Sequence, residues 1–266
     1  MQDNTKIAYL SKFTVERDPI SVGGLSDKVY RANMNGQTYF IKYGNLAEVI
    51  AEKIFNDMAS YCNLTSNEVI IIENDVIDGV IDSPYVVATK MVEGEKWHYS
   101  QSASLEILKS YAAFMAIKIF LIDDDTPEFI LAKNNKLYSI DNSISGFSDI
   151  YLEFLNGERV VVKKIGKEGY EKCKDLAFKS LSQADVSTTS MSQILFTNYK
   201  KEFEACGVAK VFIDTLYNLS NIEDKTIEQM TTGLREIYSN YAIDLVNEQI
   251  KAFRKTIKDL IESDVK

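Results

Sequence analysis

The first third of the chain carries the hydrophobic pattern of β-strands. Strand patterns run from Lys28 to Asn33 and from Gln37 to Lys42, and the turn signal Asn35–Gly36 separates them. Two further apolar runs, Glu68–Glu73 and Tyr85–Val92, are typical of strands as well. Residues 5–42 as a whole carry strand patterns, and with the two later runs they predict a five-stranded sheet.

Helical periodicity interrupts this sheet once and then dominates the rest of the chain. Apolar residues recur at spacings of three and four from Leu46 to Ala59, after the third predicted strand. A second helix is predicted from Ala103 to Ile122, and heptad-like apolar spacing continues from Val211 to Leu260. The pattern therefore predicts an α+β protein with a β-rich first part and a mainly helical second part.

A β-hairpin with acidic ends follows the second predicted helix. Its strands are Phe129–Ala132 and Leu137–Ile140, and a turn over Lys133–Lys136 places Glu128 directly opposite Asp141. The two side chains are then about 5 Å apart at Cβ, and like charges so placed destabilise a hairpin unless a positive charge lies between them. A divalent metal that carries phosphates fits that position.

An acidic run, Asp123–Asp125, lies between the second helix and Pro127. Carboxylates at the C-terminal end of a helix oppose its dipole and cost stability, so three in a row favour a functional reading over a solvated helix end.

A loop of small residues, Ser21–Asp27, lies two strands before Lys42. A Gly23–Gly24 pair taken alone indicates only a turn. Followed by a hairpin and a strand-terminal lysine, it favours a loop whose backbone N–H groups cover phosphates, with Lys42 neutralising them.

This order of features resembles the protein-kinase-like superfamily. There a catalytic aspartate is followed five residues later by a metal-binding asparagine, and after a hairpin by a metal-binding aspartate. Asp123, Glu128 and Asp141 have that arrangement, and the Asp141-Asn142-Ser143 run is similar to the atypical branch of HipA-like kinases and type II phosphatidylinositol kinases. The chain departs from the family in two respects: glutamate stands at 128 in place of asparagine, and no His-Arg precedes Asp123.

The resemblance implies a site for ATP with Mg²⁺ or Mn²⁺. Asp123 is expected to orient or deprotonate the acceptor hydroxyl, while Glu128 and Asp141 hold the metal. The chain around Met91 and Glu93 is expected to be the hinge that offers backbone groups to adenine. The residues implied to bind the nucleotide are Gly23, Gly24, Ser26, Lys42, Met91 and Glu93.

A glutamate from the first helix should pair with Lys42, and two residues qualify. Glu48 and Glu52 are four residues apart and share one flank of that helix. We prefer Glu48, because the HipA-like pattern carries an early glutamate, and Glu52 is the close alternative.

The sequence thus predicts a bilobal protein-kinase-like fold, with a nucleotide-binding N-lobe over residues 1–93 and a helical C-lobe with the catalytic hairpin over residues 94–266. The expected function is phosphoryl transfer to a protein serine or threonine hydroxyl. The alternatives are a pseudokinase that binds nucleotide or a partner without turnover, a phosphatidylinositol kinase, and an unrelated metal-dependent hydrolase that uses the acidic run.

Composition excludes several classes of function and indicates a cellular compartment. The 266 residues carry a net charge of −9, which argues against a nucleic-acid-binding protein held by phosphate contacts. One histidine excludes histidine triads and zinc clusters, and three scattered cysteines indicate a reducing compartment. With no transmembrane run and no signal peptide pattern, we expect a cytoplasmic protein, or a bacterial effector or toxin exported into a host cell.

Overall fold

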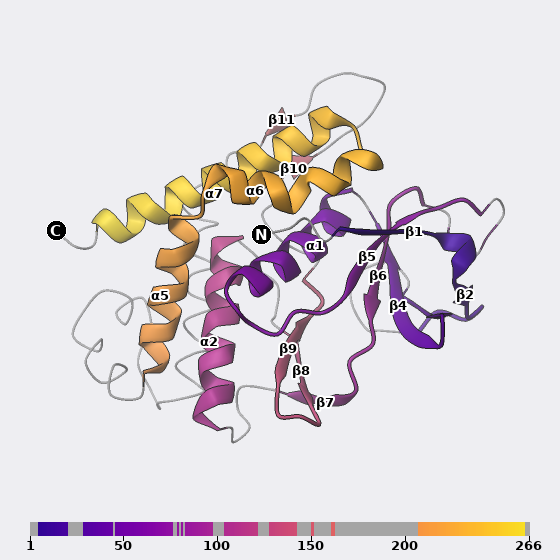
Figure 1. Ribbon diagram of the computed structural model, residues 1–266, viewed down its shortest axis with the longest axis horizontal. Coiled ribbons are helices and arrows are strands. Elements are labelled where there is room, and N and C mark those ends of the chain that lie inside the picture. The colour runs from indigo at the N-terminus through magenta and orange to yellow at the C-terminus, as the bar shows by residue number, and fades with distance from the viewer. Residues whose placement is uncertain are drawn as a thin grey trace.

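The computed structural model describes residues 5–20, 29–44, 46–76, 79, 81, 83–97, 104–121, 128–142, 150–151, 161–162 and 207–263. A curled six-stranded sheet forms one end of the molecule, as Figure 1 shows. Its strands are β1 (Lys6–Tyr9), β2 (Thr14–Val15), β3 (Tyr30–Met34), β4 (Gln37–Tyr43), β5 (Val69–Glu73) and β6 (Val86–Lys90).

The strand order is β1-β5-β6-β4-β3-β2, and all neighbours are antiparallel except β1 and β5. The prediction of five strands was one short, because the chain before residue 20 forms two short strands separated by the 3₁₀ turn η1 (Leu10–Lys12). The predicted β3–β4 hairpin is confirmed. Asn35 and Gly36 have φ of 53° and 77°, the left-handed values that a tight hairpin turn requires, and Asn33 Oδ1 accepts the Gly36 N–H at 3.1 Å.

One helix, α1 (Leu46–Tyr61), follows β4 as predicted. Its apolar residues lie in the main hydrophobic core, which continues from α1 through the later helices. Contacts run from α1 to β5 and β6 on one side and to α2 and α6 on the other. A helix of the β-rich part of the chain is therefore also packed against the helical part.

A second sheet of three strands contacts α2 through β9 and consists of β7 (Gly94–Trp97), β8 (Glu128–Ala132) and β9 (Leu137–Ile140), in the order β7-β8-β9. The sequence indicated no strand at Gly94–Trp97, so β7 is a correction to the prediction. Its first residue has to be glycine, because a Cβ on Gly94 would lie 2.3 Å from the Leu131 carbonyl oxygen.

The β8–β9 hairpin exists where it was predicted, but its register is shifted by one residue. Leu131 pairs with Leu137, so Glu128 lies opposite Ile140 and not opposite Asp141. The turn is longer than expected because Asn135 adopts a left-handed conformation (φ 60°) and donates its N–H to the Ala132 carbonyl at 2.9 Å.

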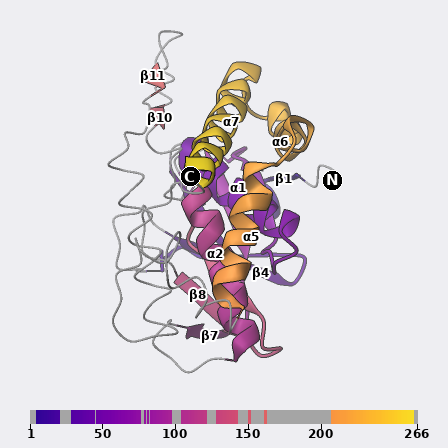
Figure 2. The ribbon, with the colours of Figure 1, turned by 90° about the vertical axis from the view of Figure 1, so that its left-hand side faces the viewer.

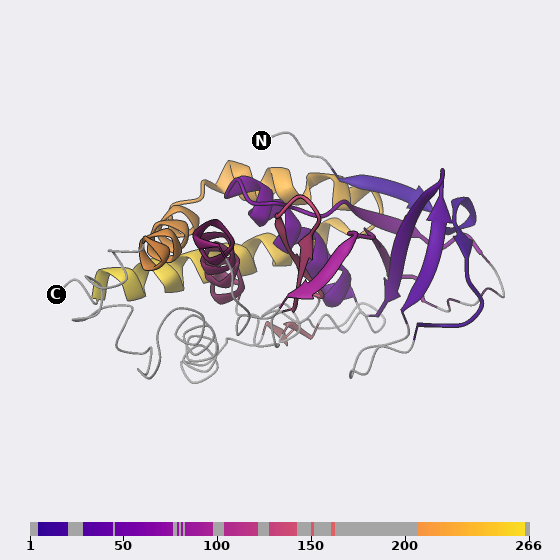
Figure 3. The ribbon, with the colours of Figure 1, turned by 90° about the horizontal axis from the view of Figure 1, so that it is seen from below.

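The helical part lies at the other end of the molecule (Figures 1 and 3). It contains α2 (Leu105–Phe120), α5 (Val208–Ser220), α6 (Asp224–Thr231), the 3₁₀ turn η3 (Thr232–Glu236) and α7 (Asn240–Ser263), and two short strands, β10 (Ile150–Tyr151) and β11 (Val161–Val162), pair antiparallel. Ser104 caps α2, since its side chain accepts the Ile107 N–H. Figure 2 shows α2 and α5 side by side, in agreement with their contacts.

The predicted fold class is confirmed: the chain is α+β, with a curled β-rich N-terminal part, one inserted helix and a mainly helical C-terminal part, the arrangement expected of a bilobal kinase-like fold. The boundary at residue 93 stays a prediction. In the part of the chain that the structure describes, none of the helices is long and apolar enough to cross a membrane.

Candidate active site

A cavity of about 290 Å³ lies between the six-stranded sheet and the β8–β9 hairpin. Most of its wall is apolar, and one end is charged. The apolar wall comes from Ile20, Val29, Phe40, Met91, Val92, Ile130 and Ile140. The charged end contains Lys42, Glu52 and Asp141, and Glu128 also lines the cavity.

Alternation along β4 brings Lys42 into this cavity. Side chains two residues apart in a strand share a face, so Phe40 and Lys42 face the cavity while Tyr39 and Ile41 are buried on the other face. The Lys42 side chain is 21% exposed, and its Nζ donates to Asp141 Oδ1 at 2.8 Å and lies 3.5 Å from Glu52 Oε2. The predicted lysine therefore lies where an incoming phosphate can reach its charge.

Glu52 is the helix residue that pairs with Lys42, and the preference for Glu48 was wrong. The Glu52 side chain is 2% exposed, and its Oε2 accepts both the lysine and the Asn142 backbone N–H, the latter at 3.0 Å. Glu48 lies in the first turn of α1, beside Gly44. Because each residue advances a helix by about 1.5 Å, Glu52 lies one turn further along and reaches the middle of the site.

The charge of Lys42 is held by its surroundings. Burial by itself lowers the pKa of the Lys42 ammonium group, but the nearby carboxylates of Glu52 and Asp141 outweigh this effect and raise the pKa above its ordinary value. Lys42 is therefore a fixed cation at neutral pH.

Asp141 has an unusual backbone conformation. Its φ is 57°, in the left-handed region that aspartate tolerates better than most residues. Asp141 lies just beyond β9, so strand alternation does not set the direction of its side chain. The left-handed turn does, and it directs the Asp141 carboxylate to Lys42.

Glu128 and Asp141 line the same cavity although they do not pair across the hairpin. Glu128 Oε1 accepts a hydrogen bond from Lys96 Nζ of β7 at 2.7 Å, so a lysine lies beside the carboxylate that was predicted to need a positive charge. Hard carboxylate oxygens suit Mg²⁺ and Mn²⁺, and Mg²⁺ is commonly held by one or two carboxylates plus phosphates. The described residues form no cluster of three or more His, Cys, Asp or Glu that could hold a metal ion. Metal binding by this pair stays a prediction.

Several predicted residues lie outside the described residues: Gly23, Gly24, Ser26 and the catalytic candidate Asp123. Of the hinge candidates, Met91 lines the cavity, and its N–H donates to the Thr38 carbonyl at 2.9 Å. The Met91 N–H is therefore already used within the protein. Glu93 lies in a neighbouring groove and pairs with Lys133 at 3.1 Å.

The sequence prediction missed the apolar wall and Lys96. Phe40 could have been found, because strand alternation places it on the same face as Lys42. Ile130 shares a face of β8 with Glu128 in the same way. Lys96 had no local signal, since its approach to Glu128 depends on the pairing of β7 with β8.

No protein-family model matches the sequence, and the comparison with curated proteins gives no match. Among solved structures, the chain is similar to the proinflammatory kinase CtkA of Helicobacter pylori, at 12% identity and a TM-score of 0.36 over 82% of this chain and 100% of that one. It is also similar to a chain in the complex of Neurospora crassa PAN2 with the pseudokinase PAN3, at 11% identity and a TM-score of 0.34 over 98% of this chain and 70% of that one. At these TM-scores neither likeness bears on function.

Proposed function

We propose that the chain catalyses ATP- and metal-dependent phosphoryl transfer to a serine or threonine hydroxyl of a protein. One observation carries the proposal: Lys42, Glu52 and Asp141, from three separate elements, meet at one end of a cavity whose wall is mainly apolar. An apolar slot with a cation and carboxylates at one end suits a ligand with a flat base and a phosphate tail.

Each residue has a defined part in this proposal. The apolar wall holds the base, and Lys42, oriented by Glu52, neutralises the phosphates. Glu128 and Asp141 hold Mg²⁺ or Mn²⁺, which supplies further neutralisation of the phosphates when bound. Asp123 orients the acceptor hydroxyl, a role that comes from the sequence resemblance alone, as does the choice of a protein acceptor.

A pseudokinase is the second candidate, and a specific observation favours it. Both carboxylates that are proposed to hold the metal already have a lysine partner: Asp141 contacts Lys42, and Glu128 contacts Lys96. If these ion pairs persist when nucleotide binds, the cavity binds ATP without assembling a transfer-competent metal site.

Paired binding and transfer measurements test the proposal. Binding of a fluorescent ATP analogue is titrated with and without Mn²⁺, and [γ-³²P]ATP is used to label the protein itself and added protein mixtures, with phosphosites mapped by mass spectrometry. We expect metal-dependent binding and labelled Ser or Thr residues, both weakened in Asp141→Asn. Metal-independent binding without labelling supports the pseudokinase, and no nucleotide binding at all overturns both.

The control is Lys133→Met. Lys133 is an exposed lysine that pairs with Glu93 outside the cavity, so its loss should change neither measurement.

A further inference from the structure

A buried polar pair lies directly behind the candidate metal ligand Asp141. Ser139 and Asn142 are 4% and 1% exposed, and Ser139 Oγ donates to Asn142 Oδ1 at 2.7 Å. The Asn142 backbone N–H donates to Glu52 Oε2 at 3.0 Å. Asn142 is therefore held through its side chain by β9 and through its backbone by α1.

A contribution to the stability of the fold does not explain why residue 142 is an asparagine. Its side-chain Nδ2 is buried, and it has no hydrogen-bond partner in the described structure. A buried donor without an acceptor loses its hydration with nothing in return, whereas an apolar side chain of similar size avoids that cost. An asparagine at this position needs another explanation.

The geometry of the pair supplies one. The hydrogen bond joins residues 139 and 142, so it closes a short loop of chain that contains Asp141. Asp141 has the left-handed backbone conformation within that loop, and its Oδ1 accepts from Lys42 Nζ. Such a conformation persists only where the surrounding structure determines it.

We propose that the Ser139–Asn142 hydrogen bond is a positioning device: it fixes the left-handed turn at Asp141 and so presents the Asp141 carboxylate to the metal and phosphates in the cavity. This inference rests on the proposed function. Asn142 and Ser139 do not line the cavity, so they act through Asp141 and are positioning residues. Groups that orient a metal ligand typically change metal affinity about 10- to 100-fold when they are removed.

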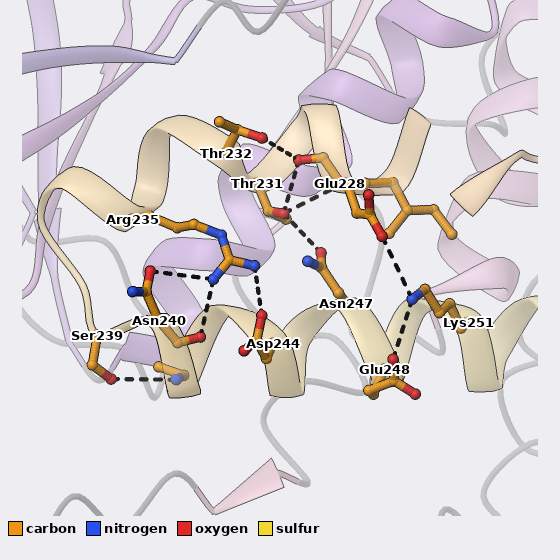
Figure 4. Close-up of polar contacts among 12 residues, drawn as sticks. Glu228, Thr231, Thr232, Arg235, Ser239, Asn240, Asp244, Asn247, Glu248 and Lys251 are labelled. Carbon is orange, nitrogen blue, oxygen red and sulfur yellow. Dashed lines mark hydrogen bonds and ion pairs between the residues drawn. The ribbon is translucent and has the colours of Figure 1, made fainter. Parts of the chain in front are cut away.

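The chain contains a matched control far from the cavity. Thr231 of α6 and Asn247 of α7 are likewise buried, and Thr231 Oγ1 donates to Asn247 Oδ1 at 2.7 Å, as Figure 4 shows. This pair has the same hydrogen-bond length as Ser139–Asn142 and is similarly buried, but it joins two helices, and the Thr231 hydroxyl also lies within reach of the Ile227 and Glu228 carbonyls.

Two double variants separate positioning from general packing. Ser139→Ala with Asn142→Leu replaces both partners at the site, and Thr231→Val with Asn247→Leu replaces both partners of the control, so neither leaves a single orphaned group. The thermal unfolding midpoint is measured first. Mn²⁺ is then titrated against a fixed concentration of a fluorescent ATP analogue, which reads metal-dependent nucleotide binding without requiring turnover.

We expect the site double variant to raise the Mn²⁺ midpoint about tenfold or more while its thermal midpoint stays near that of the unsubstituted protein. The control double variant should keep the Mn²⁺ midpoint of the unsubstituted protein. An unchanged Mn²⁺ midpoint in the site variant, or equal shifts in both variants, overturns the proposal.

Two single variants keep the test decisive if the site double variant fails to fold. Ser139→Ala removes one hydroxyl and should raise the Mn²⁺ midpoint, whereas Ser139→Thr keeps the hydroxyl and should restore it. Equal midpoints for these two variants overturn the positioning role. Failure of the proposed function looks different, because the unsubstituted protein itself would then show no metal-dependent nucleotide binding.

Discussion

Two lysines of this protein, Lys42 and Lys53, are both largely buried and both paired with a carboxylate, yet they have different surroundings. Lys42 lines a cavity and contacts Glu52 and Asp141, which come from other elements. The Lys53 side chain is 5% exposed, pairs with Asp57 one turn along the same helix, and donates to the Met230 carbonyl of α6 at 2.7 Å.

The comparison shows that a buried ion pair does not by itself mark a functional site. The pair at Lys53 is enclosed between α1 and α6, where it can only join two elements. The group around Lys42 borders open space, so its charge is available to a ligand. Successive residues of α1, Glu52 and Lys53, thus serve the site and the fold respectively.

The largest expected effect is the loss of phosphoryl transfer when Lys42 is replaced. Lys42→Met removes the cation that is proposed to contact the phosphates, so transfer measured with [γ-³²P]ATP should fall by about 10²- to 10³-fold or more. Lys42→Arg should not restore it, since a guanidinium fork replaces a compact ammonium group. Circular dichroism checks that both variants are folded. Transfer by Lys42→Met at the rate of the unsubstituted protein contradicts the proposed site.

The next effect concerns stability. Lys53→Met leaves the partly buried Asp57 without its ammonium partner and the Met230 carbonyl without its donor, so the free energy of unfolding should fall by about 3 kcal/mol. Urea denaturation at neutral pH measures this loss. Transfer per folded molecule should stay within about threefold of the unsubstituted protein, because the loss of Lys53 leaves every cavity residue in place.

Lys210→Met is the matched control for Lys53. Lys210 pairs with Asp214, also one helical turn away, but both side chains are more than half exposed. Its loss should change the free energy of unfolding by no more than about 0.5 kcal/mol. Similar losses for Lys53→Met and Lys210→Met would remove the distinction between the two pairs.

A smaller loss of transfer is expected when the glutamate that pairs with Lys42 is replaced, and it distinguishes Glu52 from Glu48. Glu52→Gln keeps the size of the side chain but removes the charge that orients Lys42, so transfer should fall about 10-fold. Glu48→Gln, one helical turn earlier, should keep transfer within about threefold. The same radiolabel assay measures both variants. Reversed sensitivities would return the assignment to Glu48.

The smallest effect is expected from pH. The folded-state pKa of Lys42 is raised above the ordinary value of 10.5, so its contribution is fully present below that value and is lost only as pH rises through the higher folded pKa. Binding of the fluorescent ATP analogue should therefore show no titration of Lys42 between about pH 6 and pH 9. A difference between the unsubstituted protein and Lys42→Met that varies with pH in this range would contradict the arrangement.

Local patterns in the sequence were enough to predict much of the fold and part of the site. Strand alternation, the Asn35–Gly36 turn and the 3.6-residue period of α1 are properties of neighbouring residues, and the elements they predicted are present. Lys42 and Asp141 were chosen because the predicted strands place one at a strand end and the other just after a strand, in the order that the kinase resemblance implies. In the structure Lys42 is the penultimate residue of β4, and Asp141 directly follows β9.

The predictions that failed depend on contacts between distant residues or on one unusual dihedral angle. The choice of Glu52 over Glu48 depends on how α1 is seated against β4, which pairs residues ten positions apart. The hairpin register depends on the left-handed Asn135, and a one-residue change in a turn moves every pairing beyond it. Strand β7 depends on β8, more than thirty residues later, so its short run carries no local signal.

The hydrogen bond between Lys53 and the Met230 carbonyl has a consequence for when α1 is fully packed during synthesis. During synthesis α1 is complete at Tyr61, whereas α6 begins only at Asp224. At about 5–20 residues per second, the ribosome takes on the order of 10–30 seconds to supply the segment that receives Lys53. Until then the side of α1 that packs against α6 stays uncovered on the nascent chain, so we expect chains released before Asp224 to be bound by chaperones.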